Sequence, residues 1–447
     1  MDVAAHEPAL APGGAARVVD AAGGLLLPGL HDHHVHVAAS VAALLSVRCG
    51  PPEVHAAADL AARLAAAPGE GWLRGVGYHE SVAGMIDRHW IDRAVPDRPV
   101  RIQHRGGRMW VFNSVGLEKL RATGLPLPPG LERESGEWTG RLFDEDDWLR
   151  RAMGSAPPSF ATMGSMFARW GVTGLTDMNP QNDMAAAQHF ANERASDALP
   201  QRVLLAGRLD LGDAPLPSLV SLGPVKVHLH EAHLPDYDAL VATVRAAHEQ
   251  GRAVAVHCVT ETELVFTLAA LREARARAGD RIEHASVAPD GLVEDIAALG
   301  LAVVAQPNFV AERGDAYLAD IPAREWPYLY RLRAFLDAGV ALAGGSDTPF
   351  GSPDPWAAMA AAVSRRTARG QVLGAQEALT PEEALGLFLA DPEDLGRCRV
   401  VARGAVADLC LLEQNWAELR TGLAKARVRA TLIDGRLVHD TVDQAPA

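Results

Sequence analysis

The sequence predicts an α/β protein built on a (β/α)₈ TIM-type barrel, and three observations carry this prediction. From about residue 171 onward, short β-branched runs alternate with helical stretches. This alternation is typical of parallel strands joined by crossover helices. Most of the runs end in a polar cluster, and a further run of the same kind lies far upstream, at Gly24–Val37. The upstream run supplies the first of eight strands, and a chain of 447 residues is long enough for such a barrel.

The other predicted strands follow in order along the chain. They are Val172–Met178, Arg202–Leu209, Val225–His230, Ala253–Cys258, Arg281–Ala285, Leu301–Pro307 and Ala341–Asp347. Helices are expected between them at Tyr237–Gln250, Glu261–Ala278, Asp290–Leu299 and Tyr328–Ala338. Capping-box spacings at Thr260 with Glu263 and at Thr380 with Glu383 predict helix starts, and Gly279 and Gly300 are expected where helices end.

The barrel is expected to span residues 28–400, with an insertion at 51–150 after its first strand. Within the insertion, Trp72–Tyr78 and Val100–His104 resemble strands, and Leu125–Trp138 resembles a polar, proline-rich loop. Residues 1–27 and 401–447 are expected to form the two parts of a small β-sandwich-like domain. Its hairpin signal is Asp434-Gly435.

Composition narrows the classes of function. The net charge of −14 and the lack of a Lys/Arg-rich run argue against nucleic acid as a partner. No apolar run is long enough to span a membrane, and no secretory signal is evident. The 4 cysteines are far apart, which fits a reducing compartment. We therefore expect a soluble cytoplasmic protein with a small-molecule substrate, and a homo-oligomer is the default expectation.

Histidines mark the end of the first predicted strand. His34 and His36 are two residues apart, and side chains at that spacing point to the same face of a strand. Two imidazoles on one face can hold one metal ion. In a histidine-rich run such a pair also arises by chance or in a solvated loop, so the pair alone is weak evidence.

Lys226 lies in the fourth predicted strand, on the same face as His228 and His230. Lysine is rarely fully buried unless it is paired or functional. Burial lowers its pKa and leaves a neutral amine, which can take up carbon dioxide to become a carbamate that bridges two ions. The alternative is an ordinary lysine that reaches solvent from a strand end.

His257, His284 and Asp347 lie at or beside the ends of the fifth, sixth and eighth predicted strands. Singly, each has an ordinary explanation: a hydrogen-bonded core histidine, or the start of an Asp-Thr-Pro turn. Together with His34, His36 and Lys226 they are expected at the carboxyl ends of the strands, where the active sites of barrel enzymes lie. The set predicts a site for one or two divalent ions. Zinc suits these ligands, with manganese or nickel as lesser options.

These residues carry a resemblance to a known family. Leu27–His36, Val256-His257, Arg281–His284 and Gly345–Asp347 resemble the metal motifs of the amidohydrolase superfamily. Further stretches resemble a narrower branch that includes N-substituted formamide deformylases: Phe167–Asp177, Ala305–Pro307 and Trp110–Ser114. The resemblance implies that Lys226 is a carbamylated bridge and that the other metal ligands are His34, His36, His257, His284 and Asp347.

Two departures from the family pattern stand out. Deaminase members usually carry a glutamate three residues after the histidine of the fifth strand, where this chain has Thr260, so the resemblance disfavours deamination. Relatives also begin with more β structure than residues 1–16 supply, so the N-terminal part of the small domain looks truncated.

The predicted reaction is hydrolysis of a C–N bond (amide, formamide or cyclic amide) in a small molecule by metal-bound hydroxide, because a bound ion lowers the pKa of water to about 7. Asp347 is expected to move protons, with His284 and His228 completing the catalytic set. Two alternatives stay open. The same site can serve deamination, isomerisation or decarboxylation, and the chain can be a non-catalytic binding relative on the same fold.

Overall fold

The computed structural model describes residues 20–51, 53–154 and 158–441. The chain divides into two compact units, one made of Met1–Val37 with Ser159–Ala447 and the other of Ala38–Pro158. The first unit contains the barrel. The second is the inserted segment, which extends beyond 51–150 on both sides.

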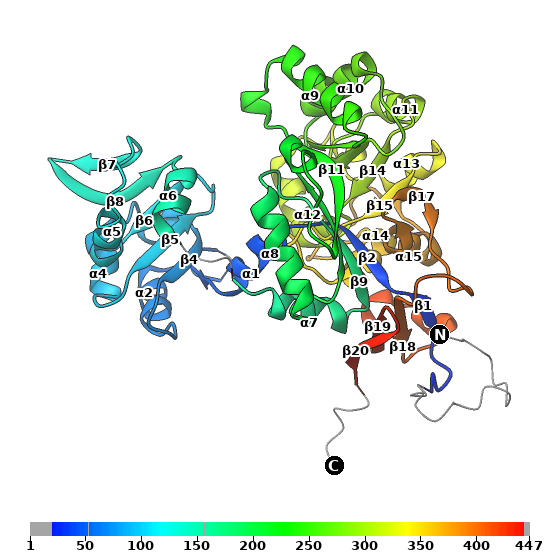
Figure 1. The fold of residues 1–447 in the computed structure, drawn as a ribbon, viewed down its shortest axis with the longest axis horizontal. Helices are drawn as coiled ribbons and strands as arrows, with labels where there is room; N and C mark the ends of the chain where they lie inside the picture. Colours follow the sequence, from blue (N-terminus) through cyan, green and yellow to red (C-terminus); the bar gives the residue numbers. More distant parts are fainter. Residues whose placement is uncertain (1–19, 52, 155–157, 442–447) are drawn as a thin grey trace. The chain divides into compact units, whose positions relative to one another are not determined.

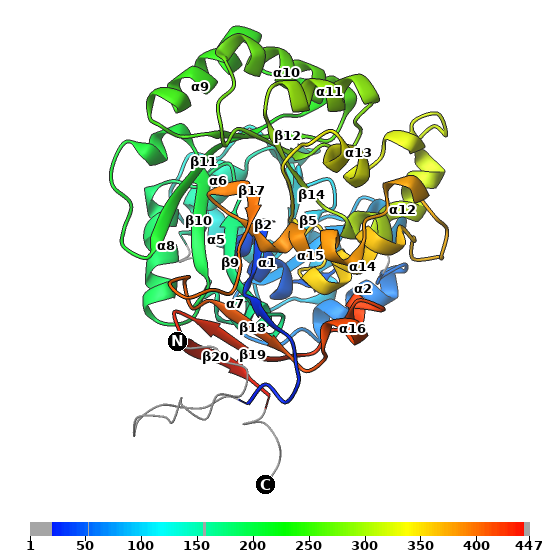
Figure 2. The ribbon, with the colours of Figure 1, turned by 90° about the vertical axis from the view of Figure 1, so that its right-hand side faces the viewer.

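Eight parallel strands form a nearly closed barrel, so the predicted α/β barrel is confirmed (Figures 1 and 2). In barrel order the strands are β2 (Leu30–Val35), β9 (Val172–Asp177), β10 (Arg202–Gly207), β11 (Val220–His228), β12 (Val254–Cys258), β13 (Arg281–His284), β14 (Ala302–Ala305) and β15 (Leu342–Gly344). Backbone hydrogen bonds join the two ends of the sheet. The amide of Asp347 donates to the carbonyl of His34 at 2.8 Å, and that of His36 to the carbonyl of Thr348 at 2.9 Å.

Helices lie around the outside of the barrel strands (Figure 2). They are α7 (Ala161–Arg169), α8 (Met184–Ala195), α9 (Tyr237–Glu249), α10 (Glu261–Ala274), α11 (Asp290–Ala298), α12 (Asn308–Asp320), α13 (Leu332–Asp337), α14 (Pro355–Ser364) and α15 (Pro381–Leu389). Both predicted capping boxes are present, at the starts of α10 and α15. The expected end of α10 near Gly279 is wrong, because Arg275 adopts a left-handed backbone with φ 64° and ends the helix earlier.

A small antiparallel sheet lies beside the barrel strands (Figure 2). It combines β1 (Leu26–Pro28) with β18 (Leu409–Leu412), β19 (Val428–Ile433) and β20 (Arg436–Asp440). Asp434 and Gly435 both have positive φ, which the tight turn between β19 and β20 requires. The described residues contribute this one sheet rather than two packed layers. Residues 1–19 of the expected N-terminal part lie outside the described ranges.

The inserted unit is built on a mixed sheet of six strands. In sheet order they are β3 (Val47–Arg48), β4 (Leu73–Tyr78), β5 (Val100–His104), β6 (Met109–Phe112), β8 (Glu137–Phe143) and β7 (Leu131–Glu134). Its helices are α2 (Ala57–Ala65), α3 (Glu80–Ala83), α4 (Arg88–Ala94), α5 (Ser114–Arg121) and α6 (Asp146–Met153). The expected loop at Leu125–Trp138 is wrong in its second half, where Ser135 and Gly136 form a turn between two paired strands.

Two further α-helices are α1 (Val37–Leu44), which follows directly after the first barrel strand and its ligand candidates, and the short α16 (Trp416–Leu419). No helix within the described ranges combines the length and apolar character that crossing a membrane requires.

The closure of the barrel leaves no room for a side chain at Gly345. A Cβ there would lie 2.5 Å from the Cβ of His34 and 2.7 Å from its backbone nitrogen. We expect Gly345→Ala to lower the free energy of unfolding by about 1–3 kcal/mol, because β2 must move away. Gly291→Ala is the matched control, since a Cβ in this first turn of α11 meets nothing within 4 Å. Urea denaturation of both variants measures the difference, and equal stabilities would contradict this account of the closure.

Candidate active site

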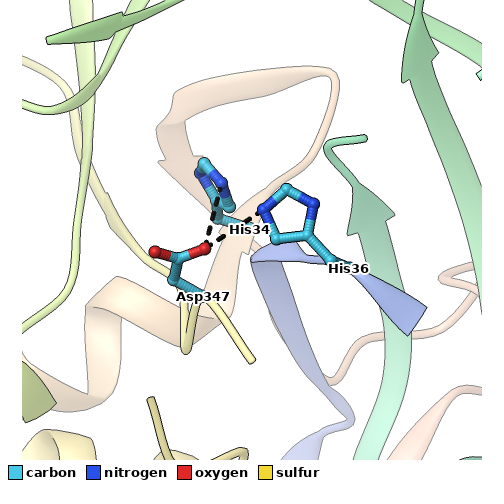
Figure 3. A group of neighbouring side chains, drawn as sticks. All are labelled: His34, His36 and Asp347. Carbon is cyan, nitrogen blue, oxygen red and sulfur yellow. Dashed lines mark ion pairs between the residues drawn. The ribbon is translucent and has the colours of Figure 1, made fainter. Parts of the chain in front are cut away.

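The end of the first barrel strand places two imidazoles against one carboxylate. His34 lies in β2 and is buried, and His36 follows the strand with 15% of its side chain exposed. Both rings turn toward Asp347, which lies just beyond β15 (Figure 3). The Nε2 atoms of His34 and His36 are 3.5 Å and 3.2 Å from the same carboxylate oxygen, Oδ1. The spacing of two residues therefore brings both histidines to one point, as the strand periodicity predicts.

These separations fit a shared metal ion. Ligand atoms at zinc–nitrogen and zinc–oxygen distances, arranged tetrahedrally, lie about 3.3 Å apart. Candidate ligand atoms of His34, His36 and Asp347 all lie within 4.8 Å of one another. Oδ1 of Asp347 is buried and has no hydrogen-bond partner among the described residues, as expected for an oxygen that faces a cation.

The protonation states of the same residues also suit a cation. The Nδ1 atom of His34 is 2.5 Å from Oε2 of Glu283, which can only accept, so we assign the ring proton to Nδ1. Burial lowers the pKa of His34 well below its usual value, so the ring is neutral and Nε2 carries a lone pair. Burial also raises the pKa of Asp347, but the nearby His34, His36 and His284 outweigh this and hold it below its usual value. A lone pair and a carboxylate that face each other repel unless a cation lies between them.

The other predicted histidines continue from this cluster as a row of neighbouring rings. The ring centroid of His284 lies 4.7 Å from that of His34 and 4.5 Å from that of His257. His228 follows, 4.3 Å from His257. Burial is the main cause that lowers the pKa of each of these three rings, to about 4 for His228. All three are therefore neutral at pH 7 and can act as ligands or hydrogen-bond partners.

The backbone of His284 explains how β13 contributes two groups to one site. In an extended strand Glu283 and His284 would point to opposite faces. His284 instead has φ 73°, and Ala285 has φ 45°, both in the left-handed region. This turn lets the His284 ring reach the row of histidines while Glu283 bonds His34. The Nδ1 atom of His284 is 2.7 Å from Oε1 of Gln306, which leaves its Nε2 lone pair for a ligand.

Lys226 is fully inside the barrel, with 5% of its surface exposed. Its Nζ atom is buried and has no hydrogen-bond partner within the described part of the chain. Burial lowers its pKa to about 8, although the carboxylates of Glu283 and Asp347 oppose this shift. Lys226 is thus not an ordinary lysine that reaches solvent. His230 does not join the site, because β11 ends at His228 and the His230 ring instead accepts from the amide of Ala232.

Residue pattern alone did not single out Glu283, Arg281 or Gln306 for a role. Glu283 is fully buried and its Oε1 accepts from Nε of Arg281 at 2.6 Å, while Arg281 also donates to the carbonyl of His33. Arg281 and Glu283 are two residues apart on β13 and so point into the barrel together. A buried charged pair in such a strand is the signal that could have found them.

Comparisons with known proteins agree with this fold. The profile of the amidohydrolase family matches residues 17–439. An N-substituted formamide deformylase of Arthrobacter pascens is 25% identical, with 95% of this chain and 90% of that protein covered. An uncharacterized metal-dependent hydrolase of Pyrococcus furiosus has a similar structure, with TM-score 0.67, 22% identity, and coverage of 86% and 87% of the two chains. Atrazine chlorohydrolase TrzN of Arthrobacter aurescens TC1, complexed with zinc, aligns with TM-score 0.51 and 12% identity over 94% of this chain and 84% of that one.

The chain belongs to the amidohydrolase family. It is accordingly an enzyme, a hydrolase that acts on carbon–nitrogen bonds.

Proposed function

We propose that this enzyme hydrolyses an amide, formamide or cyclic amide bond of a small molecule at a site that holds one or two divalent ions, zinc first among them. The observation that carries the proposal is the convergence of His34 and His36 on one oxygen of Asp347. The proposed ligands are His34, His36, His257, His284, Asp347 and a carbamylated Lys226. The formamide deformylase relative supports a C–N bond as the target.

A bound divalent ion supplies two things at such a site: a water of lowered pKa and polarisation of the scissile carbonyl. The residues of the chain do the rest. Asp347, ionised at neutral pH, accepts the proton of the attacking water and passes it to the leaving nitrogen. His228, neutral at pH 7, offers an N–H to the developing oxyanion. Glu283 and Gln306 fix the rings of His34 and His284 so that their lone pairs face inward.

A substrate panel tests this function. Purified protein is assayed for bound metal by mass spectrometry and offered N-formyl amines, simple amides and cyclic imides. We expect bound metal, equal amounts of amine (or ammonia) and carboxylic acid from the formyl amines and open-chain amides, and a single ring-opened amide-acid from the cyclic imides, with all activity lost after chelation. Ammonia released from amino-substituted rings, or carbon dioxide, would instead favour the alternative reactions. Metal-free protein with no turnover would favour a binding protein. The structure disfavours deamination further, because Thr260 caps α10 and Glu261 is exposed.

Carbamylation of Lys226 predicts a specific pH dependence. Only the neutral amine reacts with carbon dioxide, and with its pKa lowered to about 8 the neutral fraction rises with pH through that value. We therefore expect zinc reconstitution of metal-depleted enzyme to require bicarbonate. At an equal concentration of dissolved carbon dioxide it should be roughly tenfold faster or more at about pH 8.5 than at about pH 6.5. Carbon-13 bicarbonate should give a carbamate NMR signal that is absent in Lys226→Met. Full recovery without bicarbonate, at equal rates, would rule out the carbamate.

A further inference from the structure

The inserted unit carries arginines that lack acidic partners on one face of its sheet. Arg74 on β4 and Arg101 on β5 are register partners, directly opposite each other in neighbouring strands. Like charges in this position repel, so the arrangement destabilises the sheet. No carboxylate within the described ranges forms an ion pair with either guanidinium. Two neighbouring guanidinium groups without a carboxylate partner are unusual in a protein with a net charge of −14.

Arg101 is the less satisfied of the two. It is partly buried, and its Nε atom is enclosed without a hydrogen-bond partner among the residues the structure describes. Its guanidinium carbon lies 5.5 Å from the centroid of the Trp110 ring on β6. A buried N–H without a hydrogen-bond partner lowers the stability of the fold. A bound ligand with an acceptor atom would satisfy this donor.

The surrounding side chains hold both guanidiniums in place. Arg74 also lies 5.5 Å from the Trp110 ring, and it donates to Ser46 Oγ at 3.0 Å and to Gln103 Oε1 at 3.3 Å. Gln103 in turn donates to the carbonyl of Gly107, which fixes its amide. The indole N–H of Trp110 donates to Asp146, so the ring itself is held. The two cations are therefore oriented before any ligand arrives.

A third arginine extends the same face. Arg48 on β3 is exposed and pairs in register with Val76, two residues along β4 from Arg74. The opposite face of β4 and β5 is apolar and belongs to the cluster that contains Leu60, Ile91 and Ile102. Arg48, Arg74 and Arg101 thus lie on one face of the sheet, and Arg74 and Arg101 are partly buried there.

We propose that Arg74 and Arg101 form a binding site for a small oxyanion, a carboxylate in the first instance. A planar guanidinium presents paired N–H donors that match the two oxygens of a carboxylate, and partial burial strengthens such bonds. Phosphate is also an oxyanion that guanidinium groups bind, and it is the second candidate ligand for this site. The site lies within the inserted unit and does not depend on the hydrolase chemistry.

Calorimetric titration of the full-length protein with benzoate and, separately, inorganic phosphate tests the proposal. We expect saturable binding of benzoate, weakened at least about tenfold by Arg101→Met and by Arg74→Met. Arg101→Lys keeps the charge but loses the paired donors, so its affinity should be intermediate. Arg93→Met is the matched control: Arg93 is exposed on α4, whose Ile91 packs on the apolar face, and its removal changes the net charge equally. Tighter binding of phosphate than of benzoate would make phosphate the ligand at the same site.

Thermal unfolding separates a ligand-binding role from a structural one. Because Arg101 is unsatisfied in the fold, the Tm of Arg101→Met should equal or exceed that of the wild type, whereas a lower Tm would show that the arginine serves the fold. Benzoate and phosphate binding that is equal in wild type and Arg101→Met, or absent to about 10 mM, overturns the proposal. Self-association of the wild type that Arg101→Met abolishes would also overturn it and identify a contact with a second copy.

Discussion

Asp347→Asn is expected to reduce kcat/KM on the best substrate of the panel by about 10³-fold or more, with the fold intact. Asparagine has the same shape but cannot accept a proton, and proton transfer alone contributes up to about 10⁴-fold. It also removes the charge that His34 and His36 face. The barrel should survive, because the backbone hydrogen bond from residue 347 to His34 does not involve the side chain.

A control and a metal assay make this result specific. Asp337→Asn removes an equal charge from α13, where 67% of the side chain is exposed, and should leave kcat/KM unchanged. Circular dichroism of both variants checks the fold, and mass spectrometry checks bound metal. If Asp347→Asn kept more than about a tenth of the wild-type kcat/KM, its proposed part in proton transfer would have to be abandoned.

Glu283→Gln is expected to lower the free energy of unfolding by about 3–5 kcal/mol, because it leaves the buried guanidinium of Arg281 without its counter-charge. Glu283 is fully buried and Arg281 is 3% exposed, so solvent cannot take over the role of the carboxylate. The same change weakens the hold on the His34 ring, and metal affinity should fall by about 10–100-fold. Urea denaturation measures the first effect, and competition with a zinc-binding dye measures the second.

The double variant Arg281→Met with Glu283→Gln separates the two effects. Removing the unpaired charge should restore most of the stability, while the weaker amide acceptor should leave metal affinity below the wild-type value. Glu294→Gln, on the exposed side of α11, is the neutral control. Stability of Glu283→Gln within about 0.5 kcal/mol of the wild type would show that the ion pair is unimportant.

Much of this fold could be predicted from residue periodicity. Parallel barrel strands are buried on both faces, so runs such as Ala253–Val256 are continuously apolar and easy to recognise. Polar residues at their ends then stand out, which is why the spacing of His34 and His36 was informative. The helix α12 was not predicted, because its buried face is short. Phe309, Val310 and Gly314 form this face, and the polar residues around Arg313 interrupt the apolar pattern.

Other parts of the site depend on geometry that no periodicity contains. Strand alternation places His284 opposite Glu283, and only the left-handed backbone at His284 lets both serve one centre. The strand β15 ends at Gly344, before Asp347, so the carboxylate comes from a turn rather than from the sheet. The pairing of Arg74 with Arg101 likewise follows from strand register, which two segments far apart in sequence do not reveal.

The contact between the first and last barrel strands has a consequence for biosynthesis. His34 and His36 leave the ribosome early, but the carboxylate that they face is made only after most of the chain. A nascent polypeptide that stops before residue 347 therefore lacks this three-residue cluster, whatever the metal supply. Assembly of the cluster is a late event, coupled to completion of the cylinder, and partly synthesised chains should capture zinc poorly at this position.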